Sequence, residues 1–198
     1  MRRLSQASSL IILALAATLA LAPMAAASDK YEKNENVKID PAKKPAPGKA
    51  LIYFVRTQVM GAAVKAKLYA GEEFAGILAS KTFVPYECDP GKHVFAAVAE
   101  NAGLLDAEVA ADRIYVVQVA IHMGAMKARV HFEVARQGSE ALEEFLKARA
   151  DLAGITTTSD GLAWAKEEAG DDLEKMKKYR EKGEVETLKP GDGTDTLP

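Results

Sequence analysis

The chain has 198 residues, with 26 Lys or Arg against 28 Asp or Glu, so its formal net charge is −2. This length fits one domain, or one domain with an extension, and allows a sizeable core. The mild acidity argues against a nucleic-acid partner, which would need a concentrated basic patch, and gives no strong attraction to an anionic membrane. Cys88 is the only cysteine, so packing rather than an internal disulfide must hold the fold.

Residues 1–27 predict a secretory signal peptide. Arg2 and Arg3 form a short positive region, residues 10–22 are almost wholly apolar, and small alanines place the cut after Ala27. The alternative is an uncleaved anchor, but the apolar stretch is shorter than the roughly 20 residues that span a bilayer. We therefore expect a periplasmic or secreted protein with no transmembrane segment in the mature chain. Cleavage leaves 24 basic against 28 acidic residues, a charge of about −4.

A polar segment over residues 28–48, rich in Pro and Lys, predicts a linker. Residues 49–135 then alternate short apolar runs with turn residues, which is typical of an all-β domain. Residues 50–55 are apolar on both faces and predict a central strand. A hairpin is predicted from residues 64–69 to residues 74–78 around the Ala-Gly-Glu turn.

A second strand pair is predicted from residues 82–88 to residues 93–99, joined by a turn in which Gly91 takes positive φ. Pro85 lacks an N–H, so its strand should lie at an edge or carry a bulge.

The clearest predicted hairpin ends with the strand of residues 128–134. A type II′ turn at Gly124-Ala125 would pair Met123 with Met126 and set apolar residues opposite one another at every step. Polar residues then share the other face, which is either an ordinary solvated sheet face or a contact surface. This candidate contact surface comprises Gln118, His122, Lys127, Arg129, His131 and Glu133.

From Ser139 onward the apolar spacing becomes helical, with Ser139 as the N-cap of a first helix and a second helix starting near Asp160. Gly170 is expected to bend or split the second helix. We therefore expect a helical extension over residues 136–185 and a disordered tail over residues 186–198.

Several β segments resemble one known family. Residues 50–56 resemble its opening strand, residues 67–76 its hairpin, residues 83–93 its central turn and residues 111–116 its late strand entry, with Asp112 where a glycine is usual. Over residues 49–134 the chain thus resembles the small bacterial envelope domain known as domain-of-unknown-function family twenty-eight forty-six.

The resemblance implies a mainly β fold, an immunoglobulin-like antiparallel β-sandwich, here with a C-terminal α-helical extension. Members are often lipoproteins, and this chain departs from them by lacking a cysteine at the signal cut. The family has no established activity, so the resemblance provides no catalytic residues.

Metal and nucleophile chemistry has little support in the sequence. In the predicted register His122 pairs with Lys127 and His131 with Gln118. The two histidines then lie about 13 Å apart at ~3.3 Å per residue, too far to share a metal ion. Cys88 and His93 flank a turn and could form a nucleophile–base pair, but nothing supplies an oxyanion hole. Cys88 could instead be a small apolar residue or a thiol for intermolecular pairing.

We therefore expect no metal site, no cofactor and no catalytic residue. The leading hypothesis is a non-catalytic envelope module that binds or scaffolds another envelope protein or a cell-wall glycan. The alternative is a small periplasmic hydrolase or metal-dependent enzyme, and a third option is an assembly factor that uses its charged helix to hold client proteins. The sequence leaves the oligomeric state open.

Overall fold

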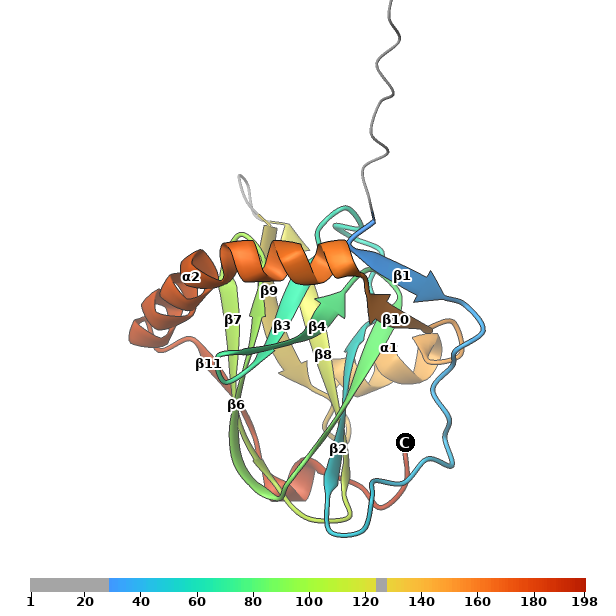
Figure 1. Cartoon of the computed structure of the whole chain (residues 1–198). Helices are drawn as coiled ribbons and strands as arrows, with labels where there is room; N and C mark the ends of the chain where they lie inside the picture. Colours follow the sequence, from blue (N-terminus) through green and yellow to red (C-terminus); the bar gives the residue numbers. More distant parts are fainter. Residues whose placement is uncertain (1–28, 124–127) are drawn as a thin grey trace, which may run out of the picture.

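The computed structural model describes residues 29–123 and 128–198. Two β-sheets pack face to face, and a helix lies on the outer face of each (Figure 1). The elements are, in chain order, β1 (Tyr31–Asn34), β2 (Ala50–Arg56), β3 (Ala66–Ala70), β4 (Glu73–Leu78), β5 (Thr82–Cys88), β6 (Gly91–Val98), β7 (Ala102–Val109), β8 (Ile114–Met123), β9 (Ala128–Val134), α1 (Glu140–Ala148), β10 (Ala153–Thr157), α2 (Ser159–Glu181), β11 (Val185–Leu188) and the short 3-10 helix η1 (Pro190–Asp192).

The six-stranded sheet has the order β1-β10-β5-β2-β8-β9, and the five-stranded sheet has the order β11-β7-β6-β3-β4. The predicted mainly β sandwich with C-terminal helix is confirmed. The prediction of purely antiparallel sheets is wrong, because β2 pairs parallel with β8, β10 with β5, and β11 with β7. Parallel partners come from distant segments of the chain, so local alternation does not reveal them.

The aromatic core between the sheets is centred on Phe54 of β2. Its ring centroid lies 5.0 Å from that of Phe95 and 5.9 Å from that of Phe132. β2 lies between β5 and β8 with all seven residues buried, which confirms the predicted central strand. The β3–β4 hairpin is confirmed as well, with Gly71 at φ +62° in its turn.

The turn after β5 does not form a hairpin. Gly91 has the expected positive φ of +123°. However, β5 belongs to the six-stranded sheet and β6 to the five-stranded sheet, so their predicted pairing is wrong. A Pro-Gly sequence marks a reversal of the chain but does not specify which sheet receives the next strand. Pro85 follows the prediction: β10 pairs only with Thr82 and Phe83, so β5 is an edge strand at Pro85.

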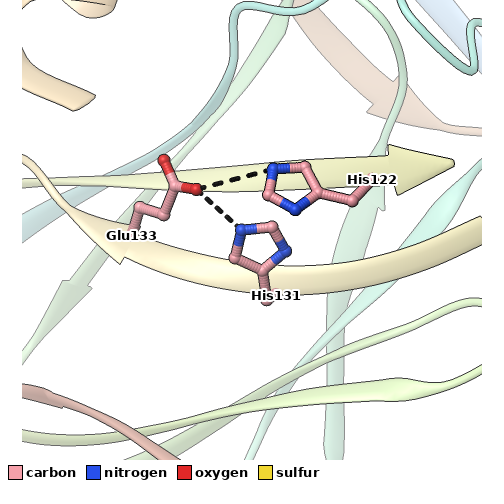
Figure 2. Close-up of side chains that lie close together, drawn as sticks. All are labelled: His122, His131 and Glu133. Atoms are coloured by element: carbon pink, nitrogen blue, oxygen red, sulfur yellow. Dashed lines mark hydrogen bonds and ion pairs between the residues drawn. The ribbon is translucent and has the colours of Figure 1, made fainter. Parts of the chain in front are cut away.

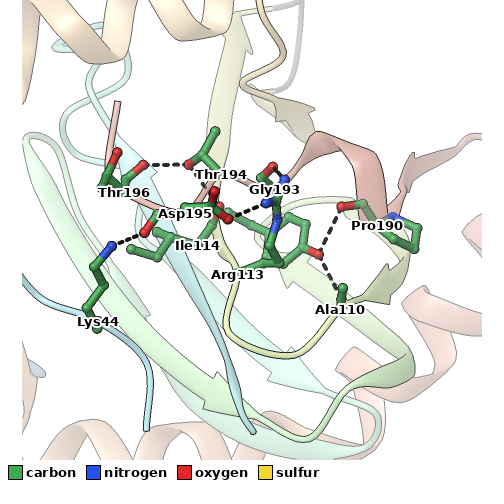
Figure 3. Close-up of polar contacts among 10 residues, drawn as sticks. Lys44, Ala110, Arg113, Ile114, Pro190, Gly193, Thr194, Asp195 and Thr196 are labelled. Carbon is green, nitrogen blue, oxygen red and sulfur yellow. Dashed lines mark hydrogen bonds and ion pairs between the residues drawn. The ribbon is translucent and has the colours of Figure 1, made fainter. Parts of the chain in front are cut away.

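Both ends of the described chain are built into the sheets, unlike the predicted linker and disordered tail. The predicted linker, residues 28–48, contains β1, and the predicted helical extension, residues 136–185, contains β10, its antiparallel partner. The predicted disordered tail, residues 186–198, contains most of β11. Thr194 also exchanges two backbone hydrogen bonds of 2.9 Å with Ile114 (Figure 3). These polar segments are held mainly by backbone pairing, which composition does not reveal.

The first helix, α1, covers the outer face of the six-stranded sheet. Its N-cap is Ser139, as predicted, whose side chain accepts a hydrogen bond from the Leu142 backbone. Phe145 is fully buried against β2 and its neighbours. Neither helix of the described chain is long and apolar enough to cross a membrane.

The second helix, α2, is one continuous helix through Gly170 on the outer face of the five-stranded sheet, so Gly170 does not split it. Buried charged residues hold α2 on this face of the sheet. Asp172 of α2 is fully buried, forms an ion pair with Lys67 of β3, and accepts a hydrogen bond of 2.7 Å from the Tyr69 hydroxyl. Glu168 forms a second ion pair with Lys67.

Candidate metal centre

β8 and β9 pair two residues out of the predicted register. Met123 lies opposite Ala128, and Val119 opposite Phe132. The predicted turn at Gly124-Ala125 lies outside the described residues, but the pairing of Met123 with Ala128 shows that the predicted Met123–Met126 pair is wrong. A slip of two residues leaves every side chain on its own face, so the apolar pattern fits both registers equally well.

The observed register brings two histidines together. His122 lies opposite Arg129, and His131 lies opposite Ala120, so the two histidines are diagonal neighbours on one face. Their ring centroids are 4.1 Å apart. The predicted separation of about 13 Å between the two histidines, at ~3.3 Å per residue, is therefore wrong. Distance consequently no longer excludes a metal ion shared by His122 and His131.

Glu133 completes a cluster with the two histidines (Figure 2). Its Oε1 atom lies 2.7 Å from Nε2 of His131 and 4.0 Å from Nε2 of His122. One ligand atom from each residue lies within 4.8 Å of the others. The side chain of His122 is 65% exposed, whereas those of His131 and Glu133 are about one third exposed, at 34% and 33%. We call these three residues the His-His-Glu cluster.

The second sheet fixes the strand that carries two members of this cluster. β9 is the last strand of its sheet, and its outer edge is capped by side chains from the turn between β6 and β7. Glu100 accepts from the Ala128 N–H, while the Asn101 amide both donates to the Val130 carbonyl and accepts from the Val130 N–H. These contacts occupy edge groups that could pair with another chain.

Gly103 of β7 allows the close approach of β7 to β9. A Cβ atom at Gly103 would lie only 2.7 Å from Cα of His131. The backbone at His131 therefore packs directly against β7, which fixes the position of this strand relative to the second sheet.

The rest of the predicted contact surface is divided. Gln118 is fully buried: it accepts a 2.8 Å hydrogen bond from Thr57 and donates to Glu144 of α1, so it ties a loop, β8 and α1 together. Arg129 is exposed beside His122. Lys127 lies outside the described residues. The predicted surface thus becomes an exposed cluster next to a buried structural glutamine.

The cluster has the donor set of a transition-metal site. Two imidazole nitrogens and a carboxylate oxygen suit Zn²⁺, Ni²⁺ or Cu²⁺. Tetrahedral coordination at about 2.0–2.2 Å would place the ligand atoms about 3.3–3.6 Å from one another. Rotation of the side chains would have to widen the 2.7 Å contact between Glu133 and His131 and shorten the 4.0 Å separation between Glu133 and His122. In the described parts of the chain neither imidazole has a second hydrogen-bond partner to buttress it, so we expect a metal that exchanges readily.

Cys88 and His93 do not form a nucleophile–base pair. Cys88 faces the core between the sheets, where burial and then the nearby Asp89 carboxylate raise the pKa of its thiol to about 11. His93 Nε2 lies 2.7 Å from the Asp89 carbonyl oxygen instead. A thiol with this pKa is almost wholly protonated at neutral pH, which disfavours nucleophilic chemistry.

Comparison with known proteins adds no further guide: no family model, no curated protein and no solved structure matches this chain. The cluster must therefore be interpreted from its own geometry.

Proposed function

We propose that this chain is an exported, non-catalytic binding module that holds a divalent transition-metal ion through His122, His131 and Glu133. The observation that carries the proposal is the convergence of their three ligand atoms within 4.8 Å. Within residues 29–123 and 128–198 this is the one group of three His, Cys, Asp or Glu side chains that meets this condition.

Several expectations from the sequence belong to the same proposal. They are the signal peptide of residues 1–27, a periplasmic or secreted location, and a role in binding or scaffolding an envelope protein or a cell-wall glycan. The immunoglobulin-like type of the sandwich, and with it the resemblance to family twenty-eight forty-six, is also part of the proposal. The packing of two β-sheets face to face around one core is the observation in its favour.

A metal-dependent hydrolase is the second candidate, because three protein ligands with an open position are also the ligand set of hydrolytic zinc enzymes. The binding role is favoured by the polar residues beside the cluster. Glu144, the carboxylate bonded to Gln118, accepts a hydrogen bond from the Gln118 amide, so it is engaged in a structural contact rather than directed at a metal-bound water. Ester hydrolysis by the zinc-loaded protein, lost in His131→Asn, would favour the hydrolase instead.

Isothermal titration calorimetry tests metal binding directly. The exported protein is purified with a tag free of histidine, stripped with a chelator and titrated with Zn²⁺, Ni²⁺ and Cu²⁺. We expect one ion per chain, with affinity weakened at least about tenfold in His122→Asn, His131→Asn and Glu133→Gln, because each variant removes one of three ligands.

His93→Asn is the matched control, because His93 is the one histidine outside the cluster. It should bind like the unmodified protein. Equal binding by all four variants, or no binding by the unmodified protein, would refute the metal site. Cross-linking and pull-down from intact cells, with and without chelator, would then show whether an envelope partner depends on the metal.

A further inference from the structure

The bound metal would have a coordination position to fill. The His-His-Glu cluster supplies three ligands, whereas a tetrahedral zinc or cobalt ion takes four. The ligands all come from one face of the β8–β9 ribbon, and His122 is 65% exposed, so the remaining position opens toward solvent.

The side chain of Arg129 is within reach of that position. Arg129 lies directly opposite His122 and two residues before His131, so all three residues are on the same face. Cβ atoms of such a cross-strand pair are about 4.5–5.5 Å apart, a gap that an arginine side chain readily spans. Arg129 is exposed, and no salt bridge involves it in the part of the chain that the structure describes.

The charges at the loaded site do not balance. A divalent ion and Arg129 together carry three positive charges, and Glu133 contributes one negative charge. The site with metal therefore has an excess of positive charge, next to a guanidinium whose fork matches the two oxygens of a carboxylate or phosphate group.

Resting on the proposed function, we infer that the loaded site binds an oxyanion: one oxygen completes the coordination of the metal ion while Arg129 donates hydrogen bonds to the same group. Carboxylate and phosphate share this chemistry. The metal ion and Arg129 recognise the ligand together, so the oxyanion does not bind without the metal.

Cobalt spectroscopy tests the inference and the proposed function separately. The full exported protein is loaded with Co²⁺ in a sulfonate buffer, and its visible absorption is recorded during titration with sodium acetate and, in a second arm, with inorganic phosphate. We expect a saturable spectral change with at least one of them, and the arm with the tighter binding identifies the chemistry. The metal-free protein should show no binding of either anion by calorimetry.

Arg129→Gln is the decisive variant, and Lys178→Gln, which removes an exposed positive charge from α2, is its matched control. Arg129→Gln should weaken oxyanion binding at least about tenfold, because it removes a charge-assisted contact, while cobalt affinity falls no further than in the control. Failure to bind Co²⁺ would overturn the proposed function and this inference together. Cobalt binding without an oxyanion response, or with an equal response in Arg129→Gln, would overturn the inference alone.

Discussion

The buried ion pair under α2 gives the strongest stability prediction. Lys67 is 2% exposed and Asp172 is fully buried, so Asp172→Asn leaves the Lys67 charge in the interface with Glu168 as its remaining ion-pair partner, beside the Trp164 ring at 4.5 Å. Removing one partner of a buried pair typically costs about 3–5 kcal/mol. Because Glu168 remains and is partly exposed, we expect the lower end, about 3 kcal/mol. With a urea m-value of about 2 kcal/mol/M, the unfolding midpoint should fall by about 1.5 M.

Replacing both charged residues separates the net contribution of the ion pair to stability from the cost of leaving one buried charge without a partner. Lys67→Met with Asp172→Leu, in a Tyr69→Phe background that removes the hydroxyl left without its acceptor, should recover most of the lost stability. Exposed Lys178→Gln on the same helix should change the free energy of unfolding by less than about 0.5 kcal/mol. A loss below about 1 kcal/mol in Asp172→Asn, or no recovery in the combined variant, would refute the view that buried charge fixes α2.

Three further predictions concern Gly103, Cys88 and Tyr69. Gly103→Ala should destabilise the protein by about 2–3 kcal/mol and weaken metal binding, because its Cβ would lie 2.7 Å from Cα of His131; parallel urea unfolding and calorimetry check both effects, and unchanged values contradict the close packing. Cys88, with its pKa raised to about 11, should react with a disulfide reagent at pH 8 only when urea unfolds the chain; rapid labelling of the folded protein would refute its burial. Burial, and then the hydrogen bond to Asp172, raises the pKa of Tyr69, so its stabilising contribution should be intact below about pH 10 and lost as the pH rises further. Thermal melts at pH 9 and pH 11 should show a smaller alkaline loss for Tyr69→Phe than for the unmodified protein, and equal losses would contradict this assignment.

Local patterns predicted the local features of this fold. The β3–β4 hairpin and the Ser139 N-cap follow from residues only a few positions apart. Asp112 has φ +60° at the turn where the resemblance has a glycine, which a short polar side chain tolerates. In each case the determining interaction lies within the segment itself.

The sequence did not predict the features that depend on contacts between distant segments of the chain. The β-branched run from Ile155 to Thr157 is short and lies between two helical patterns, and the place of β10 in the sheet depends on its distant partners β1 and β5. In the sequence Lys67 looks like a solvated residue on an alternating strand, because its ion-pair partners Glu168 and Asp172 lie on the distant helix α2. The sequence did not predict the His-His-Glu cluster, because two registers of β8 on β9 satisfy the same apolar alternation and only one of them brings His122 beside His131.

The integration of both chain ends into the sheets determines when folding can finish. β1 precedes its partner β10 by more than a hundred residues, and β7 precedes its partner β11 by more than seventy. Contacts this remote in sequence form slowly, because each closes a long loop first. The six-stranded sheet therefore cannot be completed before β10 is made, nor the five-stranded sheet before β11, and this delay fits the proposal that residues 1–27 direct export.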